Sequence, residues 1–155
     1  MTILEHIDTT IAELIESCNG NFRWGSCNER DQARAQYPHA NIYVESEECQ
    51  DSSSGVWSQE YAQQVSIRIE VWCKLDGEYE RPWIEIRKKL YQALDDLKAI
   101  FGTAWNLNGY CDTIMYRGCE IVDEPGGDQL IPAKMITHWL VNYEQDRLDP
   151  TSSTQ

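Results

Sequence analysis

The sequence lacks a long apolar run, a surplus of basic residues and the common catalytic motifs. No apolar stretch approaches the roughly 20 residues that a membrane-spanning helix needs, so no membrane contact is expected. The 13 Lys and Arg are outnumbered by 26 Asp and Glu, which gives a net charge of −13. Because nucleic-acid binding usually depends on clustered basic side chains that neutralise phosphates, this balance argues against such binding.

Catalytic and cofactor motifs are missing as well. The chain contains no GxxxxGK[ST] phosphate loop, no GxGxxG, no GxSxG and no HExxH. Its histidines, His6, His39 and His138, are far apart in sequence. The sequence therefore predicts no catalytic residue, no cofactor and no metal ligand, and we do not expect an enzyme.

The six cysteines show neither a CxxC pair nor a Cys/His cluster at the short spacing of a zinc site. The sequence begins MTILEHIDTT, with acids where an export signal carries positive charge. We therefore expect an intracellular protein with reduced thiols, several of them partly buried.

What the sequence does contain is enough apolar material for one core. Of its 155 residues, 41 % are hydrophobic and 16 are aromatic, six of these Trp. A chain of this length fits one domain. We expect this domain to span residues 1–146 and residues 147–155 to form a flexible tail.

Two segments have the apolar spacing of an amphipathic helix. In the first, from Ile3 to Cys18, apolar residues recur every three or four positions, and Asn19-Gly20 is a stop signal. The second begins at Pro82 and ends at Gly102, and its apolar stripe, from Trp83 to Phe101, is expected to lie in the core. Its basic residues are expected on a solvated face.

Strands are predicted between and after these helices. Strict alternation from Val65 to Cys73 is the clearest strand signal. Both faces of the last strand are fairly apolar, and Trp139 is expected in the core. The other expected segments are a short strand at Ala40–Glu45, a long mobile loop at Ser46–Ser58, a strand at Asp112–Asp123 with a bulge at Gly118, and the last strand at Leu130–Glu144. The order predicts an α+β fold, a two-layer domain whose small, mainly antiparallel sheet is flanked by two amphipathic helices.

Candidate contact residues follow from aromatic and charged side chains in polar surroundings. Trp72 lies on the polar face of the alternating strand, and exposed aromatic residues in such surroundings are enriched at protein interfaces. The alternative is that a helix or loop of the same chain covers it. The candidate interface residues are Trp57, Trp72, Arg68, Glu70, Glu47 and Glu48.

The layout as a whole resembles the tail terminator (tail completion, or minor tail) proteins of long-tailed bacteriophages. The resemblance includes the N-terminal helix, Tyr37-Pro38 before a short strand, the acidic loop, the alternating strand, the second helix and the final pattern MITHWLVNYE. It spans Ile3 to Glu144 and depends on element order and hydrophobic pattern, without a diagnostic motif. The six cysteines are more than such proteins usually have.

The resemblance implies a structural virion protein of the tail or neck, assembled in the host cytoplasm. Such proteins form homohexameric rings on the tail tube protein, stop its polymerisation and offer a surface to the head-tail connector or stopper protein. DNA passes through the ring without specific binding, and acids on the channel wall would repel its phosphates. The alternatives are another neck component or an acidic inhibitor that mimics DNA and blocks a nuclease.

Overall fold

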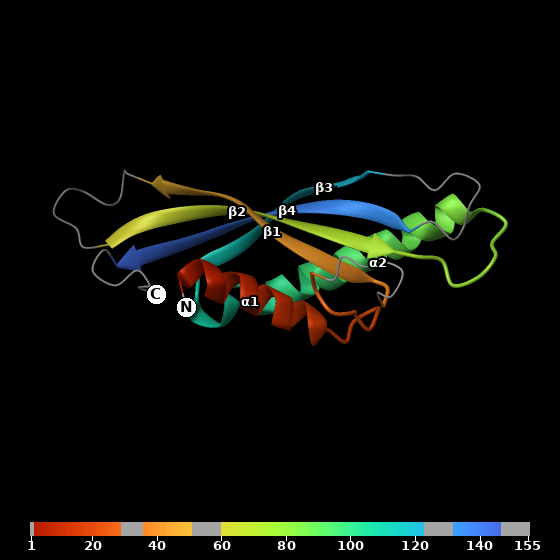
Figure 1. Ribbon diagram of the computed structural model, residues 1–155, viewed down its shortest axis with the longest axis horizontal. Helices are drawn as coiled ribbons and strands as arrows, with labels where there is room; N and C mark the ends of the chain where they lie inside the picture. Colours follow the sequence, from red (N-terminus) through yellow and green to blue (C-terminus); the bar gives the residue numbers. More distant parts are fainter. Residues whose placement is uncertain (1, 29–35, 51–59, 123–131, 147–155) are drawn as a thin grey trace.

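A computed structural model describes residues 2–28, 36–50, 60–122 and 132–146. In these residues, two long helices lie on one face of a four-stranded antiparallel sheet (Figure 1). The predicted two-layer α+β fold is therefore confirmed. The elements in chain order are α1 (Ile3–Glu16), β1 (His39–Gln50), β2 (Glu60–Cys73), α2 (Pro82–Thr103), the short 3-10 helix η2 (Leu107–Gly109), β3 (Thr113–Ile121) and β4 (Ala133–Asp146).

The strand order is β1-β2-β4-β3, so β2 and β4 are central and β1 and β3 lie at the edges. Every neighbouring pair is antiparallel. The ladder between β2 and β4 runs from Glu60 opposite Asp146 to Cys73 opposite Ala133. Gly118 is where the register of β3 shifts against β4, and its φ of 136° suits glycine, which confirms the predicted bulge.

Both helices form where the sequence provides a start signal and an apolar stripe. At the start of α1, the Thr2 hydroxyl accepts the Glu5 backbone N–H and the Glu5 carboxylate accepts the Thr2 backbone N–H, which is a capping box. Helix α2 has Pro82 in its first turn, where the missing N–H costs nothing. The buried side of α1 consists of Ile3, Ile7, Thr10, Ile11 and Ile15.

The core lies between these helices and one face of the sheet. It includes the odd-numbered residues of β2 and β4, such as Ile67 and Trp139. The indole of Trp139 packs edge-on against Phe101 of α2, with ring centroids 4.8 Å apart, and donates its N–H to the Thr137 hydroxyl at 2.8 Å. That hydroxyl donates to the backbone carbonyl of Ile69 at 2.9 Å, so the buried polar groups of Thr137 and Trp139 both have a partner.

Asp96 fixes the segment after α1 to the middle of α2. Its buried carboxylate accepts backbone N–H groups from Asn21 at 2.7 Å and Phe22 at 3.1 Å, and the indole N–H of Trp24 at 3.1 Å. A Cβ added to Gly20 would lie 2.4 Å from an Asp96 carboxylate oxygen, so the close approach requires glycine there. These bonds compensate the carboxylate for the water it loses on burial.

Two sequence predictions were wrong. Residues Ser46 to Gln50 form the end of β1 and not a loop, because their backbone pairs with β2 as far as Ala62. Strand pairing here has a larger effect on the local structure than the polar composition of the segment. Trp83 is 43 % exposed, and the Arg87 guanidinium lies 5.0 Å from its ring centroid. The buried side of α2 begins only at Ile86, one turn later.

The remaining helix and strand positions agree with the sequence predictions or lie outside the described residues. The predicted ends of the other helices and strands are close to those observed, and β2 begins five residues earlier than Val65. No helix in the described part of the chain is both long and apolar enough to cross a membrane. Residues 51–59, including Trp57, and the tail at 147–155 fall outside the described ranges.

Asp96→Ala should lower the free energy of unfolding by about 3 kcal/mol, because it leaves three donors without their acceptor. Asp95→Ala is the matched control, since Asp95 is exposed on the same helix and should change stability by less than about 0.5 kcal/mol. Urea unfolding followed by Trp fluorescence measures both. Equal losses in the two variants would show that Asp96 does not anchor this segment.

Candidate functional site: the open face of the sheet

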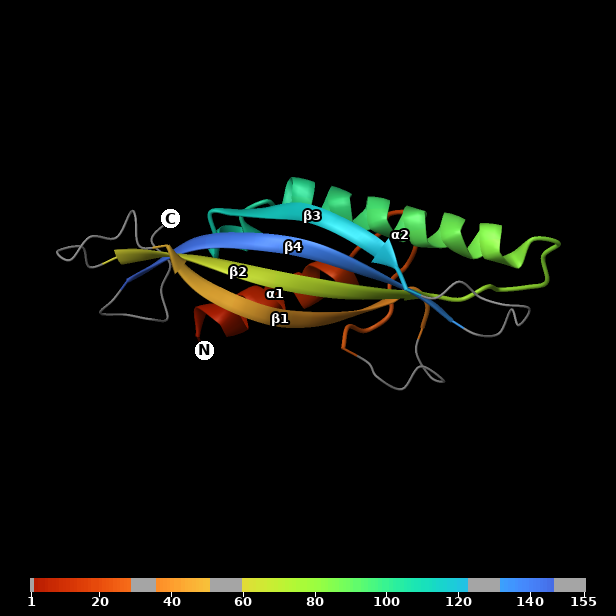
Figure 2. The same ribbon diagram turned by 90° about the horizontal axis from the view of Figure 1, so that it is seen from above.

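The face of the sheet opposite the helices, called the open face below, is turned toward the viewer in Figure 2. Because side chains alternate along a strand, this face carries alternate residues of the four strands. Arg68, Glu70 and Trp72, which the sequence places together, all belong to it. Across the sheet, Tyr43 of β1 stands opposite Arg68, and Arg68 stands opposite His138 of β4. No helix covers this face in the described residues.

Arg68 lies near the middle of the open face. Its guanidinium carbon is 4.5 Å from the ring centroid of Tyr43, which is a favourable cation–π distance. Its Nε is buried and has no hydrogen-bond partner in the described part of the chain. The described residues thus place this guanidinium charge against an aromatic ring.

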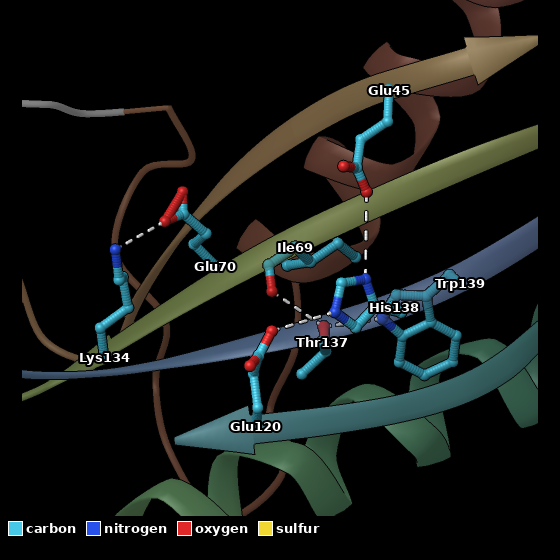
Figure 3. A network of polar contacts seen from close by, with 8 residues as sticks. All are labelled: Glu45, Ile69, Glu70, Glu120, Lys134, Thr137, His138 and Trp139. Atoms are coloured by element: carbon cyan, nitrogen blue, oxygen red, sulfur yellow. Dashed lines mark hydrogen bonds and ion pairs between the residues drawn. The ribbon is translucent and has the colours of Figure 1, made fainter. Parts of the chain in front are cut away.

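His138 connects the two edge strands. Figure 3 shows its imidazole between the carboxylates of Glu45 from β1 and Glu120 from β3. Its Nδ1 is 3.9 Å from Glu45 and its Nε2 is 3.5 Å from Glu120. Glu45 comes within reach because β1 bulges between Val44 and Ser46. These groups are substantially exposed, so the pairs contribute little to stability and remain available to a partner.

A second charged pair lies further along the face. The Lys134 ammonium is 3.1 Å from the Glu70 carboxylate (Figure 3). It is also 5.3 Å from the ring centroid of Trp72. Glu70 is only 8 % exposed, and a carboxylate buried to this degree needs a counter-charge. The indole N–H of Trp72 is buried and has no hydrogen-bond partner in the described ranges, and His39 stacks on the ring at 6.4 Å.

Apolar residues fill the spaces between these charges. Leu140 is buried, Ile136 is half-buried and Met115 is exposed. The alternation in β4 puts Ile136 and Leu140 on the face away from the helices, as the apolar pattern of the last strand predicts. A partly apolar surface with a few fixed charges has the composition of a protein contact.

The structure brings together most of the predicted contact residues, but not all. Glu48, in register with Gln64, shares the open side with Arg68, Glu70 and Trp72. Glu47 points the other way, and its carboxylate accepts the hydroxyl hydrogen of Tyr143. Sequence reasoning missed Glu45, Tyr43, Glu120, Lys134 and His138, because only cross-strand register places them beside the predicted residues.

The described residues contain no group of three His, Cys, Asp or Glu side chains that could hold a metal ion. A groove of about 180 Å³ lies between α2 and β3, on the side of the sheet away from the open face. It is lined by Lys98, Phe101, Gly102, Ile114, Tyr116 and Trp139.

None of the six cysteines forms a disulfide, and the two exposed ones, Cys49 on β1 and Cys119 on β3, lie on edge strands. Burial raises the pKa values of Cys27, Cys73 and Cys111 to about 12. Only the thiolate is nucleophilic. Burial therefore slows the alkylation of these three thiols in two ways, because it limits the approach of the reagent and keeps the sulfur protonated.

Alkylation at pH 8 should therefore modify Cys49 and Cys119 first and Cys27, Cys73 and Cys111 last. Mass spectrometry of peptides taken at successive times measures the order. The urea-unfolded chain is the control. Its thiols should all be alkylated at similar rates, because they then have similar pKa values and are equally accessible to the reagent. Equal rates in the folded protein would contradict the burial described above.

A comparison of the sequence with models of known protein families found no match, and a search among curated proteins found none either.

Proposed function

We propose that this chain is a structural subunit of a long-tailed phage, a tail terminator that forms a ring at the head-proximal end of the tail tube. There it stops tube polymerisation and offers the surface for head-tail joining. The observation that carries the proposal is the one-sided sheet. Its helices cover one face, while the open face presents Trp72, Ile136 and Met115 among charged groups. A subunit that acts by assembly would bury such a face against a partner.

The order of elements supports the same function. Helix, two strands, helix and two strands follow one another as in the layout that resembles the terminator family, and the two layers agree with it. The net charge of −13 suits a ring that DNA must cross without adhering, since acids repel phosphates.

The direct test is to add the protein to polymerising tail-tube protein and measure tube length by electron microscopy. Short tubes of uniform length, with the protein bound at one end, are the expected result. Unchanged tube lengths without end-binding would contradict the proposal.

Trp72→Ala should weaken tube-end binding by about tenfold or more, because it removes a large aromatic side chain from the open face. Its melting temperature should fall less than that of Trp139→Ala, since Trp139 is in the core. Trp83→Ala is the matched control, because Trp83 is exposed on α2 and should bind as the wild type does. Normal binding by Trp72→Ala would exclude this face from the contact.

One observation favours a second candidate, an acidic mimic of DNA that inhibits a nuclease. Helix α1 and strand β1 carry acids and no Lys or Arg, so acids are concentrated on one side of the domain. A stable monomer that binds a nuclease tightly and leaves tube length unchanged would favour the mimic over the terminator.

A further inference from the structure

Charge is distributed unequally between the two sides of the domain. Helix α1 and strand β1 together hold seven acids and no Lys or Arg: Glu5, Asp8, Glu13, Glu16, Glu45, Glu47 and Glu48. Helix α2 and edge strand β3 hold five bases and four acids: Arg87, Lys88, Lys89, Lys98 and Arg117 against Glu85, Asp95, Asp96 and Glu120. The formal charge is therefore −7 for α1 with β1 and +1 for α2 with β3.

These two sides are opposite edges of the sheet. Helix α1 packs against β1, and α2 runs alongside β3 (Figure 2). Three successive antiparallel pairings make β1 and β3 antiparallel to each other. If two copies are placed side by side in the same orientation, β1 of one copy is therefore antiparallel to β3 of the next, as neighbouring strands are within the sheet.

The first half of β1 is already covered on its outer edge. Gly25 donates its backbone N–H to Pro38, Asn28 donates its own to Ala40, and the Asn28 side chain accepts from Ile42. These bonds end at Ile42. The part of β1 beyond it pairs with β2 alone among the described residues, which leaves an outer edge for another chain.

At the β3 edge, the groove between α2 and β3 is lined by apolar side chains and one lysine. Its walls are mainly apolar, and the Lys98 ammonium lies 4.5 Å from the ring centroid of Tyr116 at the groove. Lys98 has no ion pair in the described part of the chain. A groove of about 180 Å³ lined this way suits an aliphatic side chain next to a carboxylate.

The free part of β1 offers that chemistry. Val44 is 40 % exposed, unusually so for an aliphatic residue in a strand, and acids follow it at positions 45, 47 and 48. Across the sheet, Val44 stands in line with Ile67, Trp139 and Tyr116, so it lies at the same level as the groove on the opposite edge.

We propose that the acidic β1 edge of one copy docks on the α2–β3 edge of the next, with Val44 in the groove, Glu47 on the same side as Lys98, and Glu45 and Glu48 adding negative charge on the open side of the joint. The inference rests on the proposed function, in which copies form a ring, and it names the surfaces that join them. The contact is heterologous, because two different surfaces meet, and repetition of such a contact produces a ring or a filament. A twofold contact between β1 edges would instead bring acids against acids.

The first test obstructs the groove. A Cβ at Gly102 meets nothing within 4 Å, so Gly102→Leu should fold normally while filling the groove mouth. Gly77→Leu is the matched control, because a Cβ there also meets nothing within 4 Å and Gly77 lies in the turn before α2. In sedimentation velocity at low salt, wild type and Gly77→Leu should associate, and Gly102→Leu should associate at least tenfold more weakly.

The second test reverses the charges of each edge. Lys98→Glu with Arg117→Glu, and separately Glu45→Lys with Glu48→Lys, should each abolish self-association. An equimolar mixture of the two variants should associate again, because every joint then pairs a basic edge with an acidic one. A wild type that stays monomeric, variants that associate unchanged, or a mixture that stays monomeric would each overturn the docking.

Failure of this docking is distinguishable from failure of the proposed function. If wild type controls tube length but Gly102→Leu and both charge variants do so equally well, the ring is joined by other surfaces and the docking is overturned. If the variants behave as expected in sedimentation but wild type leaves tube length unchanged, the docking stands and the terminator function fails.

Discussion

The ladder between β2 and β4 is the constraint on which the other elements depend. Each strand contributes fourteen residues, and their odd-numbered side chains from Val65 to Cys73 and from Ala133 to Tyr143 are buried on the helix side of the sheet. The edge strands attach to this pair, β1 to β2 and β3 to β4. Because side chains alternate with a period of two, the same ladder that buries Ile67 and Trp139 must place Arg68 and His138 on the open face. The register between β2 and β4 therefore determines both which side chains are in the core and which lie on the candidate contact surface.

The sequence was sufficient for the fold class because its strongest signals were periodic. Isoleucines at helical spacing predicted α1, and the alternation at Val65–Cys73 predicted β2. Ser46–Gln50 was mistaken for a loop because its polar side chains conceal a backbone that pairs with β2. Strand pairing is a long-range property, whereas composition is local.

The candidate site could be predicted only within one strand. Alternation alone placed Arg68, Glu70 and Trp72 together. The contacts of His138 with Glu45 and Glu120 require the order of four strands, and the reach of Glu45 depends on a bulge as well. Nothing in a single strand encodes these neighbours. Sequence periodicity can therefore identify a face, while the residues that meet on it depend on topology.

The free outer edge of β1 has a consequence for the chain before it assembles. An unpaired strand edge is a template for any other strand, and so a route to unwanted aggregation. In this protein that stretch carries Glu45, Glu47 and Glu48, and the whole molecule has a charge of −13. Two such edges repel each other on approach. The acids of β1 thus prevent the β1 edges of two copies from pairing with each other, while each edge stays open to a basic surface.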